Sequence, residues 1–283
     1  MGELRFDEMR VAFQGEPGAF SEAAARQLLG QGIQTVPRAT FDSTFRALTD
    51  NAADALLVPV ENTLAGSVVR VYDLLLDSPL EICGETILRI EHHLMALPGT
   101  KFDQLQSVAS HPVALAQCER FFELHPALKR VPAEDTAGSV REMMDRGDPS
   151  CGAIAGRPAA VRYGATVLRE NIEDNQENFT RFVLLLPPQE AQRYRAKDAK
   201  KVSLAMRLAH KPGALLASLE PFSRHGVNLL KIESRPIHGK PFEYQFFVDV
   251  EAERREQLDS ALNEVRSATS DLRVLGSYAP ARR

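Results

Sequence analysis

Short apolar runs that alternate with amphipathic stretches and turn residues form the main pattern at the start of this chain. The first three runs, which we expect to form strands, are residues 11–13, 35–37 and 55–58. Helices are expected to start at Ser21 and Asp42, and Ser21 is a suitable N-cap. Strands that alternate with helices in this way predict a βαβαβ unit with a parallel sheet.

The same pattern returns in the second hundred residues. The expected strands there are residues 107–109, 129–131 and 151–155. Helices are expected between them at 112–124 and 135–145, and Pro112 suits the first turn of a helix. The two halves do not match residue for residue. The sequence therefore predicts two lobes of similar α/β design without a sequence repeat.

A run of four apolar residues, 183–186, is closed by two prolines and is typical of an inner strand covered on both faces. The residues before it, 178–182, bring a hydroxyl, a guanidinium and two aromatic rings to the entry of this strand. An isolated Thr-Arg pair is usually a surface feature. Its meaning here depends on the other loops.

Four loops rich in hydroxyls, amides and glycine follow predicted strands. They are residues 14–21, 59–67, 110–117 and 156–158. Ligands of open α/β sheets bind outside the carboxyl ends of the strands, and free N–H groups at helix starts suit carboxylates or phosphates. These loops predict a site for a small anionic ligand between the two lobes.

The last third of the chain has a separate pattern. A polar and charged stretch over 187–201 is expected to be a linker. The elements expected after it are strand 202–208, helix 213–225, strand 227–233, a turn at 238–240, strand 242–251, helix 253–267 and strand 272–277. This βαββαβ order is the ferredoxin-like plan, and its size favours a regulatory or dimerising module.

Composition excludes several classes of function. The 283 residues are 44% hydrophobic and 25% charged, with a net charge of -4, which gives no basic surface for nucleic acid. Cys83, Cys118 and Cys151 lie too far apart in the sequence for a disulfide framework. The chain has neither an apolar leader at its start nor a run long enough to span a bilayer. We expect a cytoplasmic protein without nucleic-acid or membrane partners.

Motifs for cofactors and metals are also missing from the sequence. There is no Rossmann or Walker loop, no G-x-S-x-G elbow, and no metal-ligand spacing, since His92 and His93 are adjacent and diverge. What remains is a cofactor-free, metal-free site of hydroxyls, amides, one Glu and one Arg. Such a site suits the orientation of a small acid and the polarisation of a leaving group.

Six segments, in this order, resemble the prephenate dehydratase family, which converts prephenate into phenylpyruvate in phenylalanine biosynthesis. They are residues 11–21, Pro59-Val60-Glu61-Asn62-Thr63, Ser110-His111-Pro112 to Gln117-Cys118, Asn178-Phe179-Thr180-Arg181-Phe182, Gly213-Ala214-Leu215 and Glu233-Ser234-Arg235-Pro236. Val113 departs from the family pattern, which usually has Gln at this position.

The resemblance implies a fold and a division into domains. It implies a two-lobed, parallel-sheet α/β catalytic domain like the periplasmic binding proteins over residues 9–187, a linker over 188–200, and a ferredoxin-like ACT regulatory domain over 201–283. It also implies a lyase that needs no cofactor and assembles as a homodimer or homotetramer.

The resemblance further implies roles for individual residues. Thr180 would supply the hydroxyl at the departing 4-hydroxyl of the substrate. The implied catalytic residues are Thr180, Asn62, Gln117, Ser110 and Glu61. Among them, Asn62, Gln117 and Ser110 would orient the ring and its carboxylates. The implied substrate-binding residues are Arg181, Phe182, Thr63, His111 and Ser21.

Several of these residues have a structural alternative. Glu61 is either a supporting carboxylate or a buried hydrogen-bond partner, and Arg181 either holds a carboxylate or braces its loop. Ser21 is explained as a helix cap without any ligand. His111, beside Pro112 at a helix start, is expected to be structural and not a proton shuttle.

The last two segments imply feedback inhibition by L-phenylalanine. The implied binding residues are Gly213, Ala214, Leu215, Glu233, Ser234, Arg235 and Pro236, with the second group coming from a partner subunit. The alternative functions are an arogenate dehydratase, with the same chemistry on the aminated substrate, and a non-catalytic two-lobed protein that binds small acids. Chorismate mutase activity is not expected, since residues 1–10 leave no room for a helical domain.

Overall fold

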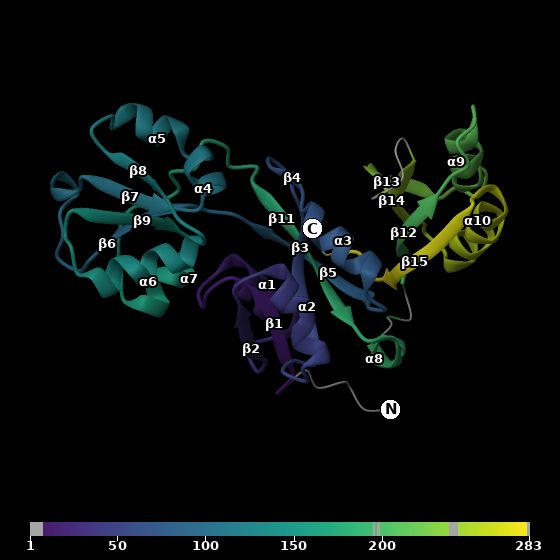
Figure 1. Cartoon of the computed structure of the whole chain (residues 1–283), viewed down its shortest axis with the longest axis horizontal. Coiled ribbons are helices and arrows are strands. Elements are labelled where there is room, and N and C mark those ends of the chain that lie inside the picture. The colour runs from purple at the N-terminus through teal and green to yellow at the C-terminus, as the bar shows by residue number, and fades with distance from the viewer. Residues whose placement is uncertain (1–7, 195, 197–198, 238–242, 282–283) are drawn as a thin grey trace. The chain divides into compact units, whose positions relative to one another are not determined.

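The computed structural model describes residues 8–194, 196, 199–237 and 243–281, and Figure 1 labels their helices and strands. The chain divides into two compact units. One contains the residues up to Tyr72 together with Thr86–Phe182, and the other contains Asp73–Glu85 and the residues from Val183 onward. Among the described residues, no helix has both the length and the apolar character needed to cross a membrane.

The first unit begins with the predicted βαβαβ fold. Its elements are β1 (Arg10–Gln14), α1 (Phe20–Leu29), β2 (Gln34–Arg38), α2 (Phe41–Thr49) and β3 (Ala55–Asn62). Strand β1 pairs in parallel with both β2 and β3, which confirms the expected parallel sheet. The short strand β4 (Gly66–Ser67) folds back antiparallel onto the end of β3. Helix α3 (Val69–Asp77) and strand β5 (Glu81–Arg89) follow, and each passes from one unit into the other.

The second sheet of this unit is mixed. Its order is β10-β6-β9-β7-β8. The elements of this lobe are β6 (His93–Ala96), the 3-10 helix η1 (Phe102–Gln104), β7 (Ser107–Ser110), α4 (Pro112–Ala116), α5 (Glu119–Leu124), β8 (Lys129–Pro132), α6 (Thr136–Arg146), β9 (Cys151–Ala155), α7 (Arg157–Tyr163) and β10 (Thr166–Arg169). Strand β7 is parallel to β8 and β9 as predicted. Strand β6 pairs antiparallel with both β9 and β10, and neither β6 nor β10 was predicted.

Alternating side chains on the central strands of this sheet supply two separate cores. Met95 and Ala153 pack with the buried faces of α6 and α7, whereas Leu94 and Ile154 pack with α4 and α5. Figure 1 shows these helix pairs with the sheet between them. The period of two along each strand therefore buries both faces of the sheet, which is why these strands have no polar side.

The helix expected over 112–124 is in fact broken into α4 and α5. The carboxylate of Asp174 accepts hydrogen bonds from the backbone N–H groups of Glu119 (2.8 Å) and Arg120 (3.0 Å), so it caps the start of α5. The N–H of Asp174 in turn donates to the carbonyl oxygen of Gln117 at 2.8 Å. A residue more than 50 positions away in the sequence thus ends the first helix and starts the second.

The predicted cap at Ser21 is wrong. Helix α1 begins one residue earlier, at Phe20, and its N-cap is Ala19, which has no capping side chain. The carboxylate of Glu22 instead accepts the N–H of Gly18 at 2.7 Å. Ser21 therefore lies inside the first turn, where its side chain is 7% exposed.

The apolar run at 183–186 belongs to a longer strand than predicted, β11 (Phe179–Leu186), in which every residue from Phe182 onward is buried. The polar motif is therefore part of the strand and not a loop before it. The segment expected to be a linker begins with helix α8 (Pro188–Tyr194), in which only Ala191 is buried and Arg193 pairs with Glu190. Helix α8 therefore buries little surface, as its polar sequence suggests, although it is helical and not an extended linker.

The second unit contains the predicted ferredoxin-like fold. Its elements are β12 (Lys201–Arg207), α9 (Ala214–Arg224), β13 (Asn228–Pro236), β14 (Tyr244–Glu251), α10 (Arg255–Ala268) and β15 (Asp271–Tyr278). They form an antiparallel sheet in the order β13-β14-β12-β15, with an apolar core between the sheet and the two helices. The turn predicted at 238–240 and the predicted strand residue Phe242 lie outside the described residues.

Residues 73–85 are part of the second unit because β15 holds them. Gly276 forms a parallel bridge with Ile82, and a Cβ at Gly276 would lie 2.1 Å from the carbonyl oxygen of Ile82. The guanidinium of Arg273 donates to the backbone carbonyl oxygens of Leu76 (2.7 Å) and Leu80 (3.5 Å). This glycine is required by the close approach of two backbones.

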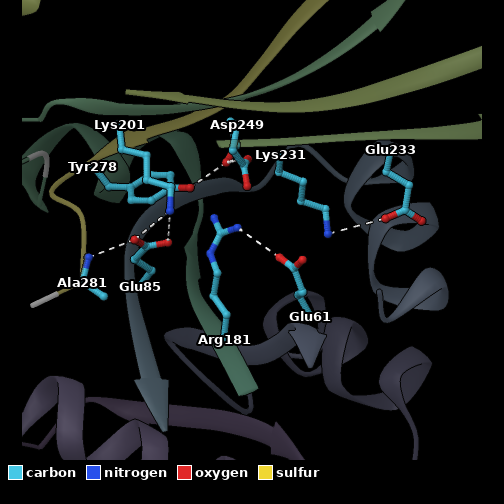
Figure 2. Close-up of polar contacts among 10 residues, drawn as sticks. Glu61, Glu85, Arg181, Lys201, Lys231, Glu233, Asp249, Tyr278 and Ala281 are labelled. Atoms are coloured by element: carbon cyan, nitrogen blue, oxygen red, sulfur yellow. Dashed lines mark hydrogen bonds and ion pairs between the residues drawn. The ribbon is translucent and has the colours of Figure 1, made fainter. Parts of the chain in front are cut away.

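A buried ion pair adds to these contacts. The Lys201 ammonium lies 2.9 Å from both carboxylate oxygens of Glu85, and the two side chains are 9% and 2% exposed (Figure 2). The N–H of Ala281 also donates to Glu85, at 2.9 Å. With both charges compensated and hydrogen-bonded, this pair can persist in a place where one charge alone is costly.

Replacing one member of this pair is expected to destabilise the protein strongly. In Lys201→Met the Glu85 carboxylate stays buried without its cation, which costs on the order of 3–5 kcal/mol in the free energy of unfolding. The double variant Glu85→Gln/Lys201→Met removes both charges and keeps an acceptor for the Ala281 N–H, so it should regain most of the loss. Urea unfolding measures both. A double variant no more stable than Lys201→Met would contradict this reading of the pair.

Candidate active site

A cavity of about 550 Å³ lies in the first unit, where the carboxyl ends of strands meet the starts of helices. Its lining includes Phe20 and Ser21 at the start of α1, Asn62 at the end of β3, Gln117 at the end of α4, and Thr180 in β11. This is the edge at which open α/β sheets bind ligands. The sheet topology therefore gathers segments from four distant parts of the sequence around one space.

Two neighbouring strands divide their polar residues between opposite faces. Asn62 and Thr180 line the cavity, and their chain neighbours Glu61 and Arg181 do not. Glu61 and Arg181 instead face each other (Figure 2), with Glu61 Oε2 3.8 Å from the guanidinium. Because side chains alternate along a strand, the hydroxyl and amide that face the cavity force the two charges to the other side.

The direction of the hydrogen bonds at Asn62 is set by the backbone. Asn62 Oδ1 accepts the N–H groups of Leu64 (3.0 Å) and Ala65 (2.8 Å), so it is the oxygen of the amide. Its NH2 group must then be the donor to Asn178 Oδ1 at 2.7 Å and to Thr180 Oγ1 at 2.9 Å. Thr180 therefore accepts a hydrogen bond through its oxygen and keeps its own proton for another partner.

The direction of the hydrogen bonds at Asn62 also determines which groups donate at Gln117 and His92. Because Asn178 Oδ1 accepts from Asn62, its NH2 is the group that donates to Gln117 Oε1, at 3.0 Å. Gln117 Oε1 is also 2.9 Å from His92 Nε2. A carboxamide oxygen carries no hydrogen, so His92 Nε2 must carry one. Burial lowers the pKa of His92, which keeps the ring neutral and leaves Nδ1 without a proton.

Two donors remain for a ligand after these bonds are assigned. Among the described residues, no group accepts the hydroxyl proton of Thr180, and none accepts from the NH2 of Gln117. Thr180 is 9% exposed and Gln117 is partly buried, so both are shielded from bulk water but reach the cavity. Fixed donors in such a place stabilise negative charge that develops on a ligand oxygen.

Charged groups lie at other parts of the lining. Arg70 is the only arginine or lysine among the described lining residues, and its Nε donates to Asp42 at 3.1 Å, which lowers the pKa of that carboxyl. Asp135 caps α6 by accepting the N–H of Gly138 at 2.6 Å. Burial raises the pKa of Asp135, although this hydrogen bond opposes the shift. Among the described residues, no cluster of His, Cys, Asp or Glu is placed to hold a metal ion.

Six of the residues singled out in the sequence share this cavity. They are Thr180, Asn62, Gln117, Phe182, His111 and Ser21. The imidazole of His111 accepts the N–H of Val113 through Nδ1 at 3.2 Å, so it also caps the start of α4. The structure thus gives His111 both a place in the lining and the structural role expected for it.

Four of the singled-out residues do not line the cavity, namely Ser110, Glu61, Arg181 and Thr63. Ser110 is fully buried, and its hydroxyl donates to the carbonyl oxygen of Ile154 at 2.7 Å. Thr63 Oγ1 donates to the carbonyl oxygen of Glu177 (2.8 Å) and accepts the N–H of Phe179 (2.9 Å). Thr63 therefore ties the loop after β3 to the start of β11.

Sequence reasoning missed three aromatic members of the lining, namely Phe20, Phe41 and His92. His92 was considered only as a metal ligand, and Phe20 only as part of a loop. The rings of Phe20 and His92 meet edge to face at 5.8 Å. The position of Phe20 just before the expected helix start at Ser21 was a usable signal. Nothing near His92 in the sequence indicates its partner at position 117.

A smaller cavity of about 150 Å³ lies in the second unit at the start of α9. Gly213 is the N-cap of α9 with φ of 79°, and Ala214 and Leu215 line the cavity. The other implied regulatory residues, Glu233, Ser234, Arg235 and Pro236, lie on β13 and do not line it. Glu233 pairs with Lys231 at 3.5 Å (Figure 2).

Comparisons with known proteins agree with this arrangement. The prephenate dehydratase family matches residues 11–190, and the ACT domain family matches residues 202–267. An arogenate dehydratase/prephenate dehydratase of Arabidopsis thaliana is 41% identical over 95% of this chain and 68% of its own length.

Two solved structures each have a TM-score of 0.84. One is a prephenate dehydratase from Arthrobacter aurescens in complex with L-Phe, which is 31% identical over 95% of this chain and 89% of its own. The other is GqqA, described as a novel type of quorum-quenching acylase, which is 33% identical over 96% of this chain and 98% of its own. Because the family match covers the whole cavity and its donors, this chain belongs to the prephenate dehydratase family of carbon–oxygen lyases and carries an ACT domain.

Proposed function

We propose that this protein is a prephenate dehydratase, which converts prephenate into phenylpyruvate with loss of carbon dioxide and the ring hydroxyl. One observation carries the proposal. The Thr180 hydroxyl faces the cavity, accepts a hydrogen bond from Asn62 at 2.9 Å, and has a proton that no described protein group accepts. A donor fixed in this way fits a reaction whose difficult event is the departure of one hydroxyl.

The chemistry asks little else of the protein. Loss of carbon dioxide supplies the electrons, the ring becomes aromatic, and the C–O bond of the 4-hydroxyl breaks. A threonine hydroxyl is too weak an acid to release a free proton at neutral pH. We therefore assign Thr180 the role of a hydrogen-bond donor whose bond strengthens as negative charge grows on the departing oxygen.

The remaining cavity residues fit the two carboxylates and the ring. Gln117 offers its NH2, and Arg70, which is paired with Asp42, adds positive charge to the lining. Phe20 and Phe182 supply apolar surface for the six-membered ring. Ser21 provides a second hydroxyl near the start of α1, where helix polarity favours an anion.

The implied residues outside the lining receive supporting roles in this proposal. The 3.8 Å ion pair between Glu61 and Arg181 braces the end of β3, which carries Asn62, against the start of β11, which carries Thr180. Ser110 secures the end of β7 beside His111, through its bond to the carbonyl of Ile154. These residues act on the substrate through the side chains that they hold in place.

We also propose that the enzyme is cytoplasmic.

Purified full-length protein should convert prephenate into phenylpyruvate. The chromophore of phenylpyruvate in alkali measures the product, and a parallel assay should follow phenylalanine formed from arogenate. We expect a higher kcat/KM for prephenate. A higher kcat/KM for arogenate would make this protein an arogenate dehydratase, and no turnover of either acid would overturn the proposal.

The likeness to GqqA does not lead us to propose acyl transfer. A covalent acyl enzyme needs an activated nucleophile. Cys118 is fully buried, and burial raises the pKa of its thiol far above the usual range. The described cavity lining contains no cysteine.

Thr180→Ala is expected to lower kcat about a hundredfold or more, because one donor to the leaving oxygen is lost. Thr180→Ser keeps the hydroxyl and should keep much of the activity. Thr44→Ala is a matched control, since Thr44 is fully buried with its hydroxyl bonded to the carbonyl of Thr40 and does not line the cavity. Steady-state kinetics decides, and equal kcat in Thr180→Ala would remove Thr180 from the mechanism.

We also propose that L-phenylalanine inhibits the enzyme by binding at the start of α9, together with Glu233, Ser234, Arg235 and Pro236 of a second copy of the chain in a homodimer or homotetramer. The support is the ACT match and the related structure in complex with L-Phe. The cavity at Ala214 and Leu215 offers an apolar wall for an aromatic side chain.

Leu215 and Leu216 offer a matched test of this regulatory site. Leu215 lines the small cavity, whereas Leu216 is 73% exposed and does not. Leu215→Ser is expected to raise the phenylalanine concentration for half inhibition at least tenfold, with little change for Leu216→Ser. Calorimetry on the full-length variants reports binding directly. An uninhibited wild-type enzyme that gives no heat with phenylalanine would sink the regulatory proposal.

A further inference from the structure

We propose that His92 is a positioning residue for the reaction, whose Nε2–H holds the Gln117 carboxamide with its NH2 directed into the cavity. The inference rests on the proposed function, because it concerns the same site. In this role His92 acts on the reaction through the orientation that it gives to Gln117.

The ring of His92 is held from several sides. The residue is 2% exposed and follows strand β5 by three positions. Its backbone N–H donates to Glu173 Oε2 at 2.9 Å, and its ring packs edge to face against Phe20 at 5.8 Å. Its Nε2 is thereby placed 2.9 Å from Gln117 Oε1. A donor held this firmly loses little entropy when it forms its hydrogen bond.

Two donors on one oxygen decide how the carboxamide points. Gln117 Oε1 accepts from both His92 Nε2 and Asn178 Nδ2. If the amide were rotated by half a turn, its NH2 would face the Asn178 NH2, and two donors would meet without an acceptor. With only one of the two donors left, the penalty for rotation falls. His92 therefore increases the fraction of molecules in which the Gln117 NH2 is available to the substrate.

The environment of His92 Nδ1 argues against a role for this residue in proton transfer. His92 Nδ1 is buried, and it has no hydrogen-bond partner among the described residues. Burial also lowers the pKa of the ring, so that a second proton is disfavoured. A proton-transfer histidine needs a path from its free nitrogen to the substrate or to water. His92 has a donor at one nitrogen and no such path at the other.

A double-mutant cycle tests this role. His92→Phe removes the donor and keeps an aromatic ring against Phe20, and it should lower kcat about tenfold. In a Gln117→Ala background the same substitution should have almost no further effect, because His92 then has nothing to orient. If His92→Phe lowered kcat by the same factor in the wild-type and Gln117→Ala backgrounds, the proposal would be overturned. His92→Gln, which restores an N–H donor, should regain part of the activity.

His93 provides the matched control for this cycle. It is also 2% exposed, but its Nδ1 accepts the N–H of Asn171 at 3.1 Å and it does not line the cavity. His93→Phe should change thermal stability, and any effect on kcat should be the same with or without Gln117→Ala. Should His92→Phe fail to fold, the cycle is run with His92→Met, whose flexible side chain adapts to the same space.

The pH profile separates positioning from acid–base catalysis. With a positioning role, kcat of His92→Phe should fall by a constant factor across the pH range, with the limbs of the profile unchanged. A limb that disappears in the variant would show that His92 exchanges a proton during the reaction, which would contradict the proposal. If the wild-type enzyme turned over neither prephenate nor arogenate, the proposed function itself would fail, whereas turnover with an additive cycle would refute only the role of His92.

Discussion

The site depends on one short-range constraint, the two backbone N–H groups of Leu64 and Ala65 that donate to Asn62 Oδ1. They fix which end of the Asn62 amide is the donor, and this choice passes through Asn178 to Gln117 and His92. Every later bond in the series follows from that first choice. A turn in the backbone thus orients four side chains from distant parts of the sequence, with no charged group involved.

This arrangement suits a leaving hydroxyl. An amide network costs little to bury when each oxygen has its donors, and it leaves Thr180 and Gln117 with hydrogens for a ligand. The ion pair of Glu61 and Arg181 lies on the opposite face of the same strands. Because side chains alternate along β3 and β11, these strands present neutral donors to the cavity, while the paired charges of Glu61 and Arg181 stabilise the strands that carry them.

Much of the fold follows from the sequence, because periodicity and turn residues decide it locally. The βαβαβ start and the βαββαβ end were both predicted and are confirmed. The strands β6 and β10 were missed, since four-residue antiparallel strands give almost no periodic signal. The break between α4 and α5 was also missed, because it depends on Asp174, a cap that only the tertiary structure brings near.

Part of the site was within reach of sequence reasoning and part was not. Once Asn62 and Thr180 are assigned to the cavity, alternation predicts that Glu61 and Arg181 point away, and this signal was available. The burial of Ser110 against Ile154 depends on which strands pair, so it required the structure. The partnership of His92 with Gln117 likewise joins two segments that no local pattern connects.

The direction of the hydrogen bonds is tested most directly by the tautomer of His92. Nitrogen-15 spectra of the imidazole rings in the full-length protein, assigned by comparison with His92→Gln, report which nitrogen carries the proton. We predict a neutral ring with the proton on Nε2 near pH 7. A proton on Nδ1 and a bare Nε2 would contradict the arrangement, because Gln117 would then have to turn its NH2 toward His92 and its oxygen toward the substrate.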